Sequence, residues 1–467
     1  MKNALVLALV LAALATPSAR ADQLPAGRLS NVDAIFSKWT SATPGCSVAA
    51  SIKGRVVVSK AYGSADLEHD VPNTAETIFE AGSVSKQFTA AAMLVLARDG
   101  KISFDDPVRK YIPELPDYGA PLTIRHMLNH MSGLRDWGSV AGIAGWPRTS
   151  RVYTHAHVLE IVSRQKSLNF TPGAQYSYSN TGYNLSAIIV SRVSGMPFAE
   201  FTKRRIFDPL GMTHTSWRDD FTRIVKNRAI AYEQIPQGYH QEMPFENVYG
   251  NGGLLTTVGD LLKWNENFVT PVVGGRAFVD EQQKVGIFND GKPGTYALGL
   301  VVDKYRGQKE VGHSGSTAGY RAHLVRYPDQ GVSVAVLCNV STGQATVYAH
   351  AVADALMPGV FTPAPAPAPL TPAVQPLRPA RDQLAALQGT FVSDEAEVTF
   401  VLRMDGDSLV LHRRPDTAIR LVPTATPDVF QAATIGSITF RRDAAGKVTA
   451  LSVGQDRVFD LRFQKVQ

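Results

Sequence analysis

A proline-rich segment divides this chain of 467 residues and constrains its fold more than any other feature. The run FTPAPAPAPLTPAVQPLRPA begins at residue 361. Because each proline fixes φ and lacks an amide donor, such a run cannot form the interior of a helix or sheet and makes an extended spacer instead. We therefore predict a linker over residues 361–382 between two separately folded parts, residues 22–360 and residues 383–467.

The two parts differ in their pattern of strands and helices. The longer part opens with the strand pair SVAASIKGRVVVSKAYG and closes with the strands AHLVRYP and GVSVAVLCNV, and a helix-rich section lies between them. One sheet built from both ends, with a helical insert, is the simplest arrangement. The shorter part runs as short alternating strands separated by the turns MDGDS and RDAAGK, which predicts a small all-β domain of the barrel kind.

The first 21 residues have the features of a secretory signal peptide. Lys2 precedes an apolar run from Ala4 to Ala15, and small residues end at Ala21. We expect cleavage after residues 1–21 and export of the mature chain to the periplasm or the medium. The apolar run is too short to span a bilayer, no later segment offers a full span, and no cysteine follows closely enough for a lipid anchor.

Composition narrows the classes of partner. Hydrophobic residues make up 44% of the chain and charged residues 19%, as in a soluble globular protein. The formal net charge is +6, but lysine and arginine are scattered, so the sequence predicts no nucleic-acid-binding surface. Two cysteines, Cys46 and Cys338, lie in predicted strands, and the residues alone leave open a disulfide or two buried thiols.

The stretch FEAGSVSKQFTAAAMLVLARDG, residues 79–100, carries the first candidate for chemistry. Apolar residues recur with the period of a buried helix, and Gly82 and Ser83 precede them as a breaker and a cap. Ser83 and Lys86 are three residues apart, so their side chains share one face of the first turn. Ser85 is next to Lys86 in sequence and cannot face it.

Such a pattern is weak evidence by itself. A capped helix with a solvated lysine is its usual origin, and a second S-x-x-K match occurs at Ser163 to Lys166. That second match has no glycine before it and no long apolar helix after it. The wider sequence must therefore single out Ser83.

A serine nucleophile needs a base within hydrogen-bonding reach and donors for the developing oxyanion. The G-x-S-x-G motif of one large hydrolase class does not occur in this chain. A lysine can replace histidine as the base only if it is neutral near the working pH, and both burial and the positive end of a helix lower its pKa. Lys86 heads a buried helix and is placed for both effects.

Two later segments supply further candidates. GAQYSYSNTGYNL carries Tyr178 and Asn180, and a buried tyrosine near a lysine can shuttle a proton. EVGHSGSTAGYRAHLV carries His313, Gly315 and Ser316 at the entry to a strand. We expect Gly315 to let a substrate backbone lie close to this strand.

Two other observations bear on these candidates. The amide group of Ser316 could act as an oxyanion donor together with that of Ser83. A second Y-x-N match, at Tyr249 to Asn251, has the glycine content of a tight turn before a strand. A lone tyrosine or histidine is usually structural, so the evidence for a catalytic site is the combination of these motifs and their order along the chain.

In order, S-x-x-K at Ser83, Y-x-N at Tyr178 and H-S-G at His313 resemble the motifs of the serine β-lactamase and penicillin-binding-protein superfamily. The resemblance is closest to the branch of class C enzymes, D,D-peptidases, D-aminopeptidases and esterases. It covers most of residues 30–345, including the segments DGKISFDDPVRKYIPELP, LTIRHMLNHMSGL, FDPLGMTHTSW and YGNGGLLTTVGDLLKW. The trailing β domain is similar to the lipocalin-like appendage of some of these hydrolases.

The resemblance implies a fold of the α/β (α+β) class. Its elements would be an antiparallel sheet flanked by helices, an all-helical insert and a small all-β, barrel-like C-terminal domain. Ser83 would lie in the cleft between the sheet and the insert. The strands of Cys46 and Cys338 would lie side by side, which favours the disulfide.

The resemblance also assigns roles. Ser83 would be the acylated nucleophile, Lys86 its general base, and Tyr178 would share proton transfer and protonate the leaving group. Asn180 would hydrogen-bond the substrate amide. His313 stands where many relatives have lysine, and it would tune the tyrosine or meet a substrate carboxylate.

The implied function is an exported serine hydrolase that acts on D-amino-acid-containing peptides, as a D,D-carboxypeptidase or aminopeptidase, or on small esters. A class C-like β-lactamase is one alternative, which a histidine at position 313 weakens. A sensor that captures cell-wall fragments without turnover is another. The expected partners are a small peptide, β-lactam or ester substrate and cell-wall peptidoglycan. No cofactor or metal is expected, because HMLNH, His126 to His130, lacks the glutamate of the known zinc motif.

Overall fold

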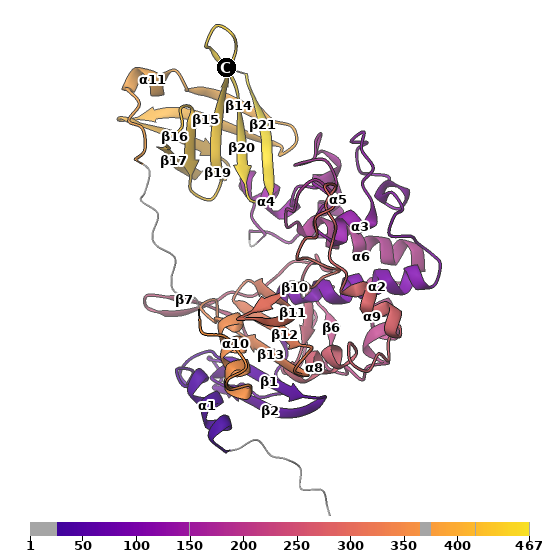
Figure 1. Cartoon of the computed structure of the whole chain (residues 1–467). Coiled ribbons are helices and arrows are strands. Elements are labelled where there is room, and N and C mark those ends of the chain that lie inside the picture. The colour runs from indigo at the N-terminus through magenta and orange to yellow at the C-terminus, as the bar shows by residue number, and fades with distance from the viewer. Residues whose placement is uncertain (1–25, 149, 365–374, 416, 467) are drawn as a thin grey trace, which may run out of the picture.

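The computed structural model describes residues 26–148, 150–364, 375–415 and 417–466. The predicted signal peptide and the middle of the predicted linker lie outside these ranges. The described residues form a six-stranded sheet surrounded by helices and, further along the chain, a closed eight-stranded β-barrel (Figure 1). The predicted fold class is therefore confirmed.

The main sheet is antiparallel throughout. Its strands, in spatial order, are β10 (Val301–Tyr305), β11 (Gln308–Thr317), β12 (Tyr320–Tyr327), β13 (Val332–Cys338), β1 (Cys46–Ile52) and β2 (Arg55–Tyr62). The smaller strands of this part are β3 (Ser64–Asp66), β4 (Val71–Pro72), β5 (Phe79–Glu80), β6 (Ser216–Trp217), β7 (Tyr232–Ile235), β8 (Gly238–Gln241) and β9 (Leu254–Thr256).

The described helices flank this sheet or fill the long section between β2 and β10, except the last, which packs against the barrel (Figure 1). They are α1 (Ala26–Phe36), η1 (Gly82–Ser85), α2 (Lys86–Arg98), η2 (Val108–Lys110), α3 (Ile124–Leu128), α4 (Trp137–Ile143), α5 (His155–Ser163), α6 (Asn180–Ser194), α7 (Phe198–Thr202), η3 (Lys203–Phe207), α8 (Val258–Glu266), α9 (Arg276–Gln282), α10 (Ala345–Leu356) and α11 (Arg381–Ala385). Among the described residues, none of these helices has the length and apolar character needed to cross a membrane.

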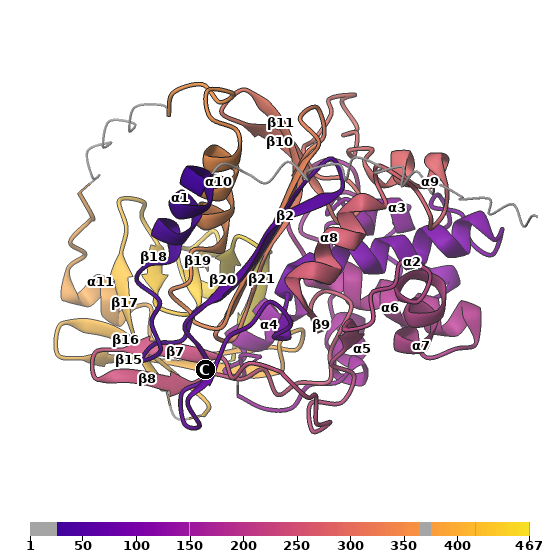
Figure 2. The same ribbon diagram turned by 90° about the horizontal axis from the view of Figure 1, so that it is seen from below.

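The sheet joins the two ends of the longer part, as the sequence predicts. Strand β1 pairs with β13 so that Cys46 lies opposite Cys338, and the two cysteines form a disulfide. Side chains alternate between the two faces of a strand. Val48 accordingly packs with α1 and α10 on one face, whereas Ala49 packs with the helical section on the other (Figure 2).

Helix α2 runs through the centre of the helical section. Every residue from Lys86 to Leu96 is buried, so the helix is enclosed on all sides and not only along one stripe. The chain enters it through the 3₁₀ turn η1, and no side-chain cap hydrogen bond forms there. The Ser85 hydroxyl instead donates to the carbonyl of Gly82 and accepts from the amide of Leu254, which fixes the turn against β9.

The barrel begins at Gly389, and its hairpins include the two predicted turns. Its strands are β14 (Gly389–Ser393), β15 (Val398–Asp405), β16 (Ser408–Arg413), β17 (Thr417–Pro423), β18 (Val429–Ala432), β19 (Gly436–Arg442), β20 (Val448–Gln455) and β21 (Val458–Lys465). The barrel packs beside α4 and α5 (Figure 1). A buried ion pair, Arg135 to Glu395 at 2.6 Å, crosses this contact, so the barrel is docked onto the helical section.

Candidate active site

Ser83 and Lys86 lie together at the start of α2. Ser83 is half-buried in η1 and Lys86 is the first residue of α2. The Lys86 Nζ lies 3.1 Å from the Ser83 Oγ, which is the contact that the three-residue spacing predicts. The second S-x-x-K match differs, because Lys166 is exposed and pairs with Asp394.

The surroundings of Lys86 disfavour its charged form. Its side chain is fully buried, and burial lowers the pKa of Lys86 well below its usual value, with Arg148 and Arg457 acting in the same direction. The Nζ has three partners: Ser83, the Oδ1 of Asn180 at 2.8 Å and the carbonyl of Asn251 at 2.7 Å.

A neutral amine has two N–H donors and one lone pair. The oxygens of Asn180 and Asn251 can only accept, so they take both donors. The lone pair of Lys86 is then left for the hydroxyl of Ser83. This geometry suits a general base. The carbonyl of Asn251 comes from the second Y-x-N match, so that segment is part of the site even though it resembles only a turn.

Tyr178 lies beside both Ser83 and Lys86. The Lys86 Nζ is 4.8 Å from the centre of its ring. Burial raises the pKa of Tyr178 above its usual value, and a hydrogen bond with Ser83 acts in the opposite direction. The phenol therefore keeps its proton at neutral pH and can donate it.

His313 is neutral in this site. Its Nδ1 lies 2.5 Å from the carbonyl of Ser314, which can only accept, so Nδ1 carries the proton and Nε2 accepts from the Tyr296 hydroxyl at 2.8 Å. Burial and the nearby Lys86 lower the pKa of His313 to about 3. A neutral His313 offers the substrate no positive charge, and the direct partner of its Nε2 is Tyr296.

Gly315 is also required by the packing of the protein itself. A Cβ at Gly315 would lie 2.0 Å from the carbonyl oxygen of Ala81, and a Cβ at Gly82 would lie 2.6 Å from the amide nitrogen of Ser316. The two glycines thus let β11 lie directly against η1. The carbonyl of Ala81 occupies the space that a Cβ at Gly315 would need, and this contact brings the amides of Ser83 and Ser316 onto adjoining segments.

Three residues of the site were not assigned to it from the sequence. His130 packs its ring 4.2 Å from Tyr178 and 4.4 Å from Tyr296, between centres, and its Nδ1 accepts from the amide of Ser179. Burial lowers the pKa of His130 well below its usual value. The pattern HMLNH drew attention to His130 only as a zinc motif, Tyr296 belongs to no motif, and Arg457 comes from the barrel.

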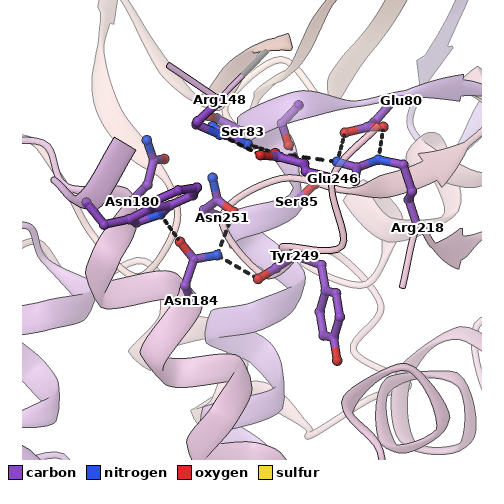
Figure 3. Close-up of polar contacts among 12 residues, drawn as sticks. Glu80, Ser83, Ser85, Arg148, Asn180, Asn184, Arg218, Glu246, Tyr249 and Asn251 are labelled. Atoms are coloured by element: carbon purple, nitrogen blue, oxygen red, sulfur yellow. Dashed lines mark hydrogen bonds and ion pairs between the residues drawn. The ribbon is translucent and has the colours of Figure 1, made fainter. Parts of the chain in front are cut away.

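Ser83, Tyr178 and His313 open onto a cleft of about 480 Å³. It is lined by Ser83, Arg148, Tyr178, Asn180, His313, Ser314, Gly315, Ser316, Arg321, Ala322, Gly343, Gln344, Ala345, Thr346, Val347 and Arg457. Arg148 is paired with Glu246, which lies 3.7 Å from the buried Arg218, itself bound to Glu80 (Figure 3). This network fixes the wall beside Ser83.

Two groups of side chains among the described residues have the geometry to hold a metal ion. One joins Glu310, His323 and His350, and the other joins Asp66, Glu68 and His69. Neither group includes a residue that lines the cleft. The arrangement around Ser83 consists of a hydroxyl, an amine, a phenol and amide groups, which are the parts of a nucleophilic site.

Comparison with known proteins agrees with this geometry. The chain is 29% identical to a D-aminopeptidase of Gluconobacter oxydans over 67% of its own length and 59% of the relative's. It is also 29% identical to penicillin-binding protein 4* of Bacillus subtilis, over 62% of its own length and 67% of the relative's. The chain thus spans about three fifths of the length of the D-aminopeptidase.

The fold has close counterparts among solved structures. The octameric penicillin-binding protein homologue from Pyrococcus abyssi superposes with a TM-score of 0.63 at 25% identity, over 94% of this chain and 99% of that one. The sequence model of the family described as Beta-lactamase matches residues 30–357, well over half of the chain. The chain therefore belongs to the beta-lactamase family.

Proposed function

We propose that this protein is a serine hydrolase that forms an acyl-enzyme on Ser83 and acts on D-amino-acid-containing peptides or amides, or on small esters. The observation that carries the proposal is the 3.1 Å contact between the Ser83 Oγ and the Nζ of the fully buried Lys86. A buried amine whose pKa is lowered is a base near neutral pH, and it touches the hydroxyl it would activate.

The residues of the cleft account for each proton. Lys86 takes the proton of Ser83 as its Oγ attacks the carbonyl carbon, and the amides of Ser83 and Ser316 hold the oxyanion. Tyr178 donates a proton to the leaving amine or alcohol and recovers one by way of Lys86. Water then attacks the acyl-enzyme and releases Ser83. The Asn180 Oδ1 is engaged by Lys86, so its –NH₂ group is the one that meets the substrate.

The relatives support the choice of substrate. One is named a D-aminopeptidase and another a penicillin-binding protein. A β-lactamase is the second candidate, because the family match carries that description. The neutral His313 argues against it, since none of the described β11 residues that line the cleft is a cation that could bind the drug's carboxylate.

Export and the cell wall belong to the same proposal. The predicted signal peptide and the Cys46–Cys338 disulfide fit an oxidising compartment outside the cytoplasm. Peptidoglycan is the main source of D-amino-acid peptides there, so it would be the substrate's origin. A sensor without turnover would have no need for a positioned base and a proton donor, and this cleft has both.

The experiment is a substrate panel with matched variants. We expect the purified chain to hydrolyse D-alanine p-nitroanilide, N-acetyl-D-alanyl-D-alanine or p-nitrophenyl acetate, with D-substrates preferred over their L-enantiomers. Ser83→Ala should remove this activity, and Ser163→Ala, in the second S-x-x-K match, should retain it. Hydrolysis that persists in Ser83→Ala would refute the proposal, as would the absence of hydrolysis across the whole panel.

A further inference from the structure

The barrel contributes one side chain to the cleft of the catalytic part. Arg457 lies in the tight turn between β20 and β21, where Gln455 pairs with Val458. It lines the same cleft as Ser83, and its guanidinium carbon is 4.7 Å from the centre of the Tyr178 ring. An appended domain therefore places a cation next to the proposed proton donor.

The turn is docked through its backbone. The carbonyl of Arg457 accepts from the amide of Asp136 at 3.2 Å and from the Nδ2 of Asn169 at 3.1 Å. The carbonyl of Asp456 accepts from the Ser177 hydroxyl at 3.1 Å. Because these contacts use main-chain atoms, the turn stays in place whatever side chain residue 457 carries, and the guanidinium is not needed to hold it.

Unlike the neighbouring cations, the Arg457 side chain donates no hydrogen bond to a carboxylate or a carbonyl among the described residues. Arg148 pairs with Glu246, and Arg321 donates to the carbonyls of Ala318 and Tyr320. Arg457 is half-buried, with its face against Tyr178. Its N–H donors are therefore available for a ligand in the cleft.

The positive charge of the cleft favours a negatively charged ligand. Three arginines and no aspartate or glutamate occur among the described residues that line it. A substrate with a free ammonium group near the reacting carbonyl would meet no anion and would be repelled. A planar guanidinium without a partner matches a carboxylate, which it binds through two parallel hydrogen bonds.

We propose that Arg457 forms a carboxylate-binding subsite, so that the barrel selects substrates that carry a free carboxylate close to the bond that Ser83 attacks. The inference rests on the proposed hydrolase function and narrows it. It favours acidic peptides of the carboxypeptidase type over substrates with a free N-terminal amine. It also assigns the barrel a part in specificity, in a cleft where the histidine of β11 supplies no charge.

The test compares matched substrates that differ in one charge. N-acetyl-D-alanyl-D-alanine and its C-terminal amide report a carboxylate in the leaving group, and succinyl- and acetyl-D-alanine p-nitroanilide report one on the acyl side. For at least one pair, we expect kcat/KM to favour the acid in the wild-type chain and Arg457→Ala to lower the acid-to-neutral ratio by about tenfold to a hundredfold. Arg457→Lys should recover part of the ratio.

The control removes the same charge elsewhere on the barrel. Arg420 is exposed on β17 and does not line the cleft, so Arg420→Ala should leave the ratio unchanged. The pair of substrates that responds to Arg457→Ala identifies which side of the scissile bond bears the carboxylate. A ratio that Arg457→Ala leaves unchanged for both pairs overturns the subsite, and so does an equal loss on acid and neutral substrates, which would mean that Arg457 serves Tyr178 alone.

A binding measurement separates this inference from the proposed function. In the Ser83→Ala background, N-acetyl-D-alanyl-D-alanine should bind at least tenfold tighter than its amide, and adding Arg457→Ala should abolish the difference. Equal binding of acid and amide overturns the subsite even if the wild-type chain hydrolyses both through Ser83. Preferential binding of the acid without any hydrolysis would uphold the subsite and refute the proposed function.

Discussion

The Lys86 Nζ lies 3.1 Å from the Ser83 Oγ and 2.7 Å from the carbonyl oxygen of Asn251. The first contact joins residues one helical turn apart. The second joins α2 to a loop far along the chain, and it aims the amine at the hydroxyl. The base is thus positioned by tertiary structure, although its sequence spacing is local.

Replacement of Ser83 gives the first prediction. Ser83→Ala removes the Oγ that forms the acyl-enzyme, so kcat/KM should fall by more than about 10⁴-fold. Ser163→Ala should stay within about twofold, because its hydroxyl only donates to the carbonyl of Glu160. Steady-state kinetics on the best panel substrate would check both. Similar losses in the two variants would contradict the assignment.

The pH dependence gives a second prediction. Lys86 must be neutral to accept a proton, and burial lowers its pKa from 10.5, so kcat/KM should rise with pH and reach its plateau below pH 10.5. Tyr178, whose pKa is raised, should cause no decline below pH 10. A pH–rate profile measures both limbs. A half-rise at pH 10.5 or above would show that Lys86 is not the base.

The pair of Tyr296 and His313 gives a third prediction. Tyr296→Phe removes the hydroxyl that donates to His313. It should lower the free energy of unfolding, measured by urea unfolding, by about 1 kcal/mol. It should add no step to the pH–rate profile between pH 5 and 7, because burial keeps His313 neutral there, with a pKa of about 3. A new step in that range that His313→Gln removes would show that His313 titrates in the catalytic range.

The docking of the barrel gives a fourth prediction. Glu395→Ala leaves the buried guanidinium of Arg135 without its carboxylate, so the free energy of unfolding should fall by about 3–5 kcal/mol. The neighbouring Asp394→Ala breaks an exposed pair with Lys166 and should cost less than about 1 kcal/mol. Urea unfolding of the two variants compares them directly. Equal losses would mean that the buried pair does not hold the barrel.

The sequence locates the local parts of this architecture well. The sheet built from both ends of the chain, the small β-barrel and the S-x-x-K turn follow from alternation, turn residues and helical spacing. Tyr296, His130 and Arg457 could not be found in this way, since each joins the site through contacts between segments distant in the chain. Gly82 and Gly315 illustrate the same limit. Glycine is needed at both positions because the backbones of η1 and β11 approach closely, and only the fold reveals that approach.

The most direct test of the central claim is covalent trapping of the nucleophile. The purified chain would be mixed with benzylpenicillin or an activated ester, quenched at successive times, and analysed by intact mass and peptide mapping. The account predicts an acyl adduct on the peptide that contains Ser83, lost in Ser83→Ala and retained in Ser163→Ala. An adduct on another residue, or one that forms equally in Ser83→Ala, would contradict it.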